Sequence, residues 1–281
     1  RGSAMAANFW TSTHCGLLLV AREEAESRER EQDKAAAAEA DAKPRRRQKR
    51  KQIVLRGAPA LDPKPGGEEG KGKRGRGSLV DQLVDFAVML GRELKIRQRP
   101  VFTACVYLRR LDEKILAPSE AGLGPGDEKD ELEEERHVTA LALSCVYLAC
   151  KVEEVPVSPE RIAGFSNGLC SRGDVLDAEL LLLENLSASL VVHHPHEDVL
   201  KYAGSLGLGK DVIQVANFVL EETYRTELCL FHPPHIIALG CLYTACAFHN
   251  KNILPWCAQI KVDEKEVARV CEEMVKHYKS L

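Results

Sequence analysis

The sequence predicts an all-α protein that contains two tandem helical repeats. Three observations support this. Apolar residues recur at helical spacing from Leu79 to the C-terminal region, and no stretch shows the strict alternation of a half-buried strand. A nine-residue apolar stretch that starts at Ala142 is also matched by one that starts at Ala238, as expected of two copies of one helical bundle.

The composition indicates a globular protein whose core is mainly aliphatic. Hydrophobic residues make up 44% of the chain but aromatic residues only 5%, so Leu, Val, Ala and Cys must fill most of the interior. No apolar run has the length of a membrane span, and we expect no membrane partner. The ten cysteines lack paired CxxC spacing, which favours buried reduced thiols in an unsecreted protein.

The N-terminal part of the chain differs from the rest in charge and complexity. Residues 1–4 are interpreted as a vector-derived remnant, 5–20 as an N-terminal helix, and 21–77 as a flexible low-complexity segment. Residues 1–77 hold 18 Lys and Arg against 11 Asp and Glu, a net charge of +7. The remaining residues hold 21 against 31, a net charge of -10. The sequence therefore predicts a basic tail on an acidic body.

The first repeat is expected to begin with two amphipathic helices. A Ser78 cap, with Asp81 three residues later, precedes apolar positions at helical spacing from Leu79 to Leu94. Pro100 suits the first turn of the second helix. Residues 117–136, rich in Gly and then in acidic residues, are predicted to form an insertion loop.

The first repeat then continues with a central helix and two more helices. The stretch from Val138 to Lys151 is apolar nearly all round, which indicates a helix surrounded by others. Ser158 and Pro159 open a short helix that Asn167 and Gly168 end. A Leu-rich helix is predicted over 174–190.

The second repeat shows three further helical patterns. One places Val212 and Val219 on a single face, and one opens at Pro233-Pro234 and runs to Phe248. A final amphipathic helix follows Asp263. The matched apolar stretches could also reflect two buried helices that acquired small residues independently, but their similarity favours a repeat.

The chain lacks the motifs of common enzyme classes. It has no phosphate loop, no GxSxG, no HExxH and no Gly-rich dinucleotide fingerprint after a possible strand. His193, His194 and His196 cluster around Pro195, without a supporting Cys or carboxylate, so we expect no metal site and no cofactor. The protein is therefore not expected to be an enzyme.

Several motifs together resemble the cyclins, and within that family the C-type cyclins. The two tandem repeats are the first of them. The others are Lys151-Val152-Glu153-Glu154 at the end of the central helix, Val191-Val192-His193-His194-Pro195 between the repeats, Thr223-Tyr224-Arg225-Thr226-Glu227-Leu228-Cys229-Leu230 before Pro233-Pro234, and the N-terminal triplet Asn8-Phe9-Trp10. The resemblance covers about residues 5–20 and 78–278. It implies two five-helix cyclin boxes, over 78–192 and 193–281.

The resemblance also implies a partner and a mechanism. Cyclins of this kind activate the kinase of the Mediator complex, cyclin-dependent kinase 8, within a module that has further Mediator subunits. They press the kinase's mobile αC helix inward so that its Lys–Glu ion pair forms, and catalysis belongs to the kinase.

The kinase-binding residues implied by the resemblance lie in three places. Lys151 and Glu179 match the family's paired Lys and Glu, and Glu154, Phe9 and Trp10 belong to the motifs above. Without the resemblance, Lys151 could simply complement a helix C-terminus, and Glu179 could be a solvated residue.

The chain departs from the cell-cycle cyclins in three respects. Those cyclins carry Met-Arg-x-x-Leu on the first box helix as part of a substrate-docking groove, whereas this chain has Leu79-Val80-Asp81-Gln82-Leu83. Docking of that kind is therefore not expected. The tail and the insertion have no counterpart in the family pattern.

A related fold suggests a rival function, and the charge distribution argues against it. General transcription factors of the TFIIB type also use tandem cyclin-like repeats and bind DNA, for which a basic body is needed. The acidic body argues against nucleic-acid binding by the repeats. The basic run in the tail favours nuclear import: Arg45, Arg46, Arg47, Lys49, Arg50 and Lys51.

Overall fold

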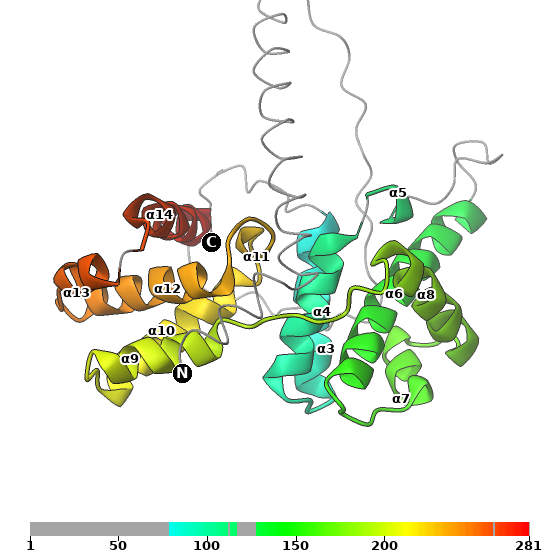
Figure 1. Ribbon diagram of the computed structural model, residues 1–281. Helices are drawn as coiled ribbons and strands as arrows, with labels where there is room; N and C mark the ends of the chain where they lie inside the picture. Colours follow the sequence, from blue (N-terminus) through cyan, green and yellow to red (C-terminus); the bar gives the residue numbers. More distant parts are fainter. Residues whose placement is uncertain (1–78, 112, 117–127, 261, 281) are drawn as a thin grey trace, which may run out of the picture. The chain divides into compact units, whose positions relative to one another are not determined.

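The computed structural model describes residues 79–111, 113–116, 128–260 and 262–280 (Figure 1). Within these ranges the ordered elements are all helices, which confirms the predicted all-α class. The expected N-terminal helix, the low-complexity segment and the Ser78 cap lie outside the described residues. No described helix combines the length and hydropathy needed to cross a bilayer.

The chain divides into two compact units. Among the described residues, the first unit comprises 79–192, Tyr224–Thr226 and 273–280, and the second comprises His193–Thr223 and Glu227–Glu272. The residues described between 79 and 192 form six α-helices and one 3₁₀ turn: α3 (Leu79–Glu93), α4 (Gln98–Arg110), α5 (Glu113–Leu116), α6 (Glu128–Val152), α7 (Pro159–Ala163), η1 (Gly164–Ser166) and α8 (Arg172–Asn185).

The core of the first unit is built around α6. From Val138 to Cys150 every residue of α6 is buried except Tyr147, as expected of a helix packed on several sides. It packs against α3, α4, α7 and α8. The fully buried Tyr107 of α4 donates its hydroxyl hydrogen bond to the carbonyl oxygen of Leu190 at 2.6 Å, which ties the chain beyond α8 to this core.

The residues from 193 onward form the remaining helices, with α12 at their centre. These helices are α9 (His196–Ser205), α10 (Lys210–Thr223), α11 (Leu228–Phe231), α12 (Pro234–Phe248), α13 (Leu254–Gln259) and α14 (Glu264–Ser280). Helix α12 begins after Pro233, as predicted, and packs against α9, α10 and α11.

The short segment Tyr224–Thr226 is part of the first unit although it follows α10 in sequence. The ring of Tyr224 stacks on that of Phe102 of α4, with 4.4 Å between centroids and 4° between planes. The guanidinium of Arg109 donates a hydrogen bond to the carbonyl oxygen of Arg225, whose own side chain pairs with Asp85.

The two matched apolar stretches lie in α6 and α12 and make similar close contacts. Ser144 of α6 is fully buried and donates a hydrogen bond to the carbonyl oxygen of Val175 in α8 at 2.6 Å. The matching residue of α12 is Gly240, where an added Cβ would lie 2.5 Å from Cγ1 of Val270 in α14. Small residues thus stand where neighbouring helices approach, as the repeat predicts.

Two predicted boundaries are wrong. Residues 128–136, predicted as part of the insertion loop, form the first turns of α6. This stretch is rich in Glu, Lys and Leu, which are good helix formers, and its acidic residues suit a helix N-terminus. Helix α8 ends at Asn185, five residues before the predicted 190. Ser187 and Ala188 adopt left-handed conformations there, a helix end that no glycine signals in the sequence.

Helices α5, α9, α11 and α13 carry little sequence signal. Helix α9 has only two buried residues, Val199 and Ala203, so its apolar periodicity is weak. The other three are six residues or shorter.

Candidate functional site

Lys151 and Glu179, which the sequence pairs through a family pattern, lie side by side in the first unit. Lys151 stands in the last turn of α6 and Glu179 in the middle of α8. The Lys151 Nζ lies 2.5 Å from Oε1 of Glu179, a distance typical of a strong charge-assisted hydrogen bond. Two residues that are 28 positions apart in sequence thus form one charged feature.

The two members of this pair differ in exposure. The Lys151 side chain is 53% exposed, whereas the Glu179 side chain is only 9% exposed. Glu179 is therefore not the solvated residue that the sequence alone allowed. Its position beside Ala178 and Leu182, on the face of α8 that packs inward, accounts for the burial. The exposed ammonium is the part of the pair that a partner can reach.

Tyr147 also holds the lysine in place. The Nζ of Lys151 lies 5.3 Å from the centroid of the Tyr147 ring, one turn earlier in α6. At this distance the ring face attracts the cation. The negative end of the α6 dipole favours the same charge. The ammonium is therefore held by a carboxylate, an aromatic ring and a helix end.

Glu153 anchors the C-terminal end of α6 to α4. Its Oε2 lies 2.7 Å from Nε of Arg99, and its Oε1 accepts a hydrogen bond from the Thr103 hydroxyl at 2.8 Å. The next residue, Glu154, has φ of 56°, and its N–H donates to the carbonyl oxygen of Lys151. The turn that ends α6 is thereby fixed, and Glu154 is exposed close to Lys151.

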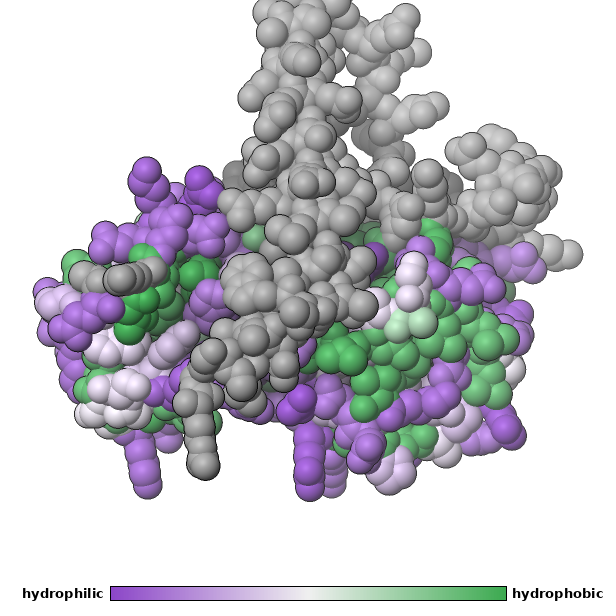
Figure 2. Space-filling view, in the orientation of Figure 1, coloured by the Kyte–Doolittle hydropathy of each residue, from purple (hydrophilic) through white to green (hydrophobic). Residues whose placement is uncertain are grey.

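Hydrophobic surface accompanies the charged pair. Leu180, which follows Glu179 in α8, is 64% exposed. In the orientation of Figure 1, hydrophobic residues gather on the surface over α6 and α8 (Figure 2). A face that combines a fixed cation with exposed aliphatic groups is suited to bind a protein, because it offers apolar area and a charge-assisted donor together.

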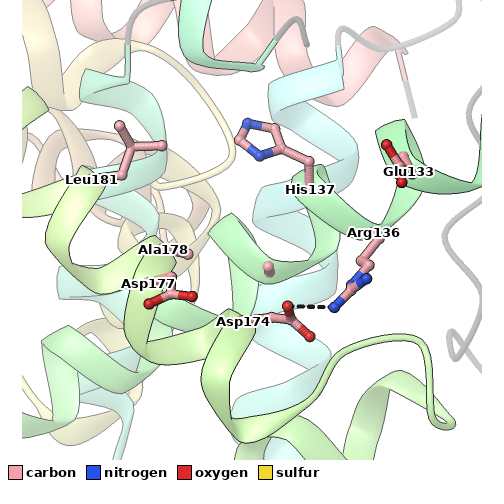
Figure 3. A pocket seen from close by; sticks show the side chains of 8 residues that line it. Glu133, Arg136, His137, Asp174, Asp177, Ala178 and Leu181 are labelled. Carbon is pink, nitrogen blue, oxygen red and sulfur yellow. Dashed lines mark hydrogen bonds and ion pairs between the residues drawn. The ribbon is translucent and has the colours of Figure 1, made fainter. Parts of the chain in front are cut away.

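A pocket lies between the N-terminal half of α6 and α8 (Figure 3). It has a volume of about 420 Å³. Figure 3 shows the ion pair between Arg136 of α6 and Asp174 of α8, joined at 2.6 Å. The residues that line it are Glu133, Arg136, His137, Ala140, Asp174, Asp177, Ala178 and Leu181.

The structure places the other predicted site residues as follows. Phe9 and Trp10, and the basic run from Arg45 to Lys51, lie outside the described residues. Among the residues described, no group of three or more His, Cys, Asp or Glu could hold a metal ion. His194 and His196 make an edge-to-face ring contact, with 6.3 Å between centroids.

Three residues of the site were not identified from the sequence: Tyr147, Glu153 and Leu180. Tyr147 has a usable signal, because it precedes Lys151 by four residues and therefore shares its helix face. Glu153 stands in the motif that ends the central helix, but nothing in the sequence indicates its contacts, because its partners lie 50 or more positions away. The exposure of Leu180 depends on the crossing of α6 and α8, which the sequence does not specify.

Comparisons with known proteins agree on one family. The family model described as "Cyclin, N-terminal domain" matches residues 76–191. The chain is 31% identical over 204 residues to Cyclin-C of Rattus norvegicus, covering 67% of this chain and 68% of that protein. It is 30% identical to Cyclin-C1-1 of Oryza sativa subsp. japonica, covering 98% of this chain and 90% of that protein.

The fold is also similar to a solved structure of the yeast RNA Pol II CTD kinase CTDK-1 complex. The TM-score is 0.53 and the identity 21%, over 71% of this chain. The match covers 64% of the yeast chain, so this chain spans less than two thirds of it. At this identity the similarity concerns the fold alone.

Proposed function

This chain belongs to the cyclin family, and on that premise we propose that it is the C-type regulatory subunit of a transcription-associated cyclin-dependent kinase. Cyclins are regulatory subunits, and the chain itself is proposed to have no catalytic role. The proposed partner is a kinase of the type of cyclin-dependent kinase 8, together with the other subunits of the Mediator kinase module.

The observation that carries the proposal is the Lys151–Glu179 pair on the face formed by α6 and α8. Both residues stand at the family positions expected to contact the kinase. The exposed ammonium of Lys151 can donate to carbonyl oxygens of a partner while Glu179 holds it in place. Glu154 is exposed beside it and is proposed to contribute to the same contact.

The pair can act on the kinase by positioning rather than by chemistry. In kinases, phosphoryl transfer requires an ion pair between a strand lysine and a glutamate of the αC helix. A rigid subunit that binds αC in its inward position favours the active state by its differential affinity for that state. The ion pair between Glu153 and Arg99, which ties the end of α6 to α4, supports this proposal.

Charge reversal at Lys151 tests the proposal. In Lys151→Glu, the new carboxylate lies beside Glu179 and the partner loses a donor, at an expected cost of about 2 to 5 kcal/mol. This corresponds to about 30-fold to several thousand-fold weaker binding, measured by calorimetry with the cyclin-dependent kinase 8 subunit. Lys151→Gln, which keeps a donor toward Glu179, is expected to bind with intermediate affinity.

Lys201 offers a matched control in the second unit. Its Nζ lies 6.0 Å from the centroid of the Tyr202 ring, so Lys201→Glu makes the same charge change beside an aromatic ring. It is expected to bind the kinase like wild type. Circular dichroism of each free variant checks folding. Wild-type affinity in a folded Lys151→Glu protein would refute the assignment of this face. If that variant does not fold, wild-type affinity of a folded Lys151→Gln refutes it.

We propose nuclear residence, with import directed by the run from Arg45 to Lys51. The support is the density of positive charge in that run and the transcriptional role proposed above. Replacing its six basic residues by Ala is expected to lower the nuclear fraction seen by fluorescence microscopy. An unchanged nuclear fraction would exclude the run as the signal for nuclear import. Phe9 and Trp10 are proposed to contribute to kinase binding from the N-terminal segment.

A further inference from the structure

The pocket between α6 and α8 is separate from the Lys151–Glu179 pair. The two helices touch where Ser144 donates to the carbonyl oxygen of Val175. The α6 residues that line the pocket, 133–140, all precede Ser144, whereas Lys151 follows it. On α8, Asp177 is two residues from Glu179, and two residues correspond to about 200° around a helix. Pocket and pair therefore lie at different levels along α6, on either side of Ser144, and on different faces of α8.

The pocket has an apolar base and an acidic rim. Ala140, Ala178 and Leu181 supply aliphatic surface. Glu133 and Asp177 supply carboxylates, and Figure 3 shows them on opposite sides, from α6 and α8 respectively. Arg136 and Asp174 neutralise each other in their ion pair, so the acidic residues of the rim leave the lining with a net charge of about -2.

We infer that this pocket is a docking site for an arginine or lysine side chain carried by a segment of a partner protein. The aliphatic stem of such a side chain can lie on the alanines and the leucine, as long basic side chains do on apolar surface. Its cationic end can then form a charge-assisted hydrogen bond with a carboxylate of the rim, that of Glu133 or that of Asp177.

Several features of the unit favour a cationic peptide over other occupants. A volume of about 420 Å³ falls within the range of pockets that hold ligands larger than a single side chain. Leu132, which precedes the lining residue Glu133 in α6, is 45% exposed. Apolar neighbours of the basic residue can bury this surface. The net charge of -10 over residues 78–281 also attracts a basic segment.

Alanine methyl groups at the base of the pocket allow a direct test. The full chain, labelled with ¹³C at Ala methyls, is titrated with N-acetyl-arginine amide in low salt, and with N-acetyl-norleucine amide, which has an uncharged side chain. The arginine derivative is expected to shift the signals of Ala140 and Ala178 in a saturable manner. The norleucine derivative is expected to bind at least about fivefold more weakly.

Charge-neutral variants decide whether the carboxylates are responsible. Glu133→Gln/Asp177→Asn is expected to weaken arginine binding at least about fivefold. Glu93→Gln/Glu272→Gln, which removes the same charge at exposed positions of α3 and α14, is expected to leave it unchanged. Equal effects of the two double variants, or shifts at Ala140 and Ala178 that do not saturate, would overturn the inference. Displacement of the probe by a peptide with the sequence of residues 45–51 would also overturn it, because the occupant would then be a segment of this chain and not of a partner.

The same titration separates this site from kinase binding. Lys151→Glu is expected to bind the arginine derivative like wild type, even though it loses the kinase. Arginine binding that is lost together with kinase binding in Lys151→Glu would show that the two sites are one, and would contradict the separation argued above.

Discussion

At the scale of single residues, the ammonium of Lys151 depends on a neighbour that makes no hydrogen bond with it. Tyr147→Leu removes the ring face 5.3 Å from Nζ but keeps an apolar side chain. We expect kinase affinity to fall by about 0.5 to 1 kcal/mol, or two- to fivefold. Tyr147→Phe keeps the ring and should bind like wild type. Equal affinities of the Leu and Phe variants in calorimetry would exclude the role of the ring.

Asp174 links helix capping to pH. Its carboxylate accepts a hydrogen bond from the Ser171 N–H at 2.6 Å, while the Ser171 hydroxyl accepts one from the Asp174 N–H at 3.3 Å. Partial burial raises the pKa of Asp174, but the bonds from Ser171 and the pair with Arg136 outweigh it, so that the pKa lies below its ordinary value.

The direction of this shift sets the pH range of the effect. A carboxyl whose pKa is lower in the folded protein stabilises it above the ordinary pKa, near 4, and loses this contribution as the pH falls through the lower folded value. Asp174→Asn should therefore lower the urea midpoint at pH 7 and have a smaller effect near pH 3. A difference from wild type that is larger at pH 3 than at pH 7 would contradict this account.

At the scale of helices, the contact between α12 and α14 leaves no room for a side chain at Gly240. An added Cβ would lie 2.5 Å from Cγ1 of Val270, so Gly240→Ala is expected to destabilise the protein by about 1 to 3 kcal/mol. Gly204 of α9 provides the control, because a Cβ there meets nothing within 4 Å. Gly204→Ala should stabilise by about 0.5 to 1 kcal/mol. Thermal unfolding of both variants measures the difference, and equal shifts would refute the close contact.

The helices that the sequence predicts are those with a strong physical signal. α6 and α12 are apolar on nearly every side, and α3 and α14 have clear apolar stripes, so their existence follows from composition and periodicity. The end of α8 could not be predicted, because Ser187 and Ala188 adopt positive φ through backbone hydrogen bonds such as that from Ala188 N–H to Leu183. Nothing in their side chains encodes that choice.

Only part of the candidate site could be predicted from the sequence. Lys151 and Glu179 could be named only through a family pattern, since neither residue type nor spacing connects positions 28 apart on different helices. The burial of Glu179 and the ring of Tyr147 emerged from the packing of α6 against α8. Phe9, Trp10 and the basic run remain predictions.

At the scale of the whole molecule, the cysteines agree with the expected aliphatic core. Within the described residues nine cysteines are free thiols, and eight of them are buried. Burial raises the pKa of Cys150 and of Cys170 to about 11, which keeps these thiols protonated and unreactive at neutral pH. They serve as small apolar residues in the core, as Cys145 and Cys241 do at matching positions of α6 and α12.

The placement of Tyr224–Thr226 in the first unit has a consequence for biosynthesis. Residues 79–192 leave the ribosome before the segment that supplies the Tyr224 ring to Phe102 and the Arg225 carbonyl oxygen to Arg109. At about 5 to 20 residues per second, the interval between residues 192 and 226 is about 2 to 7 seconds. During that interval the nascent chain lacks the ring that stacks on Phe102 and the carbonyl oxygen that accepts the hydrogen bond from Arg109, so the core of the first unit stays incomplete.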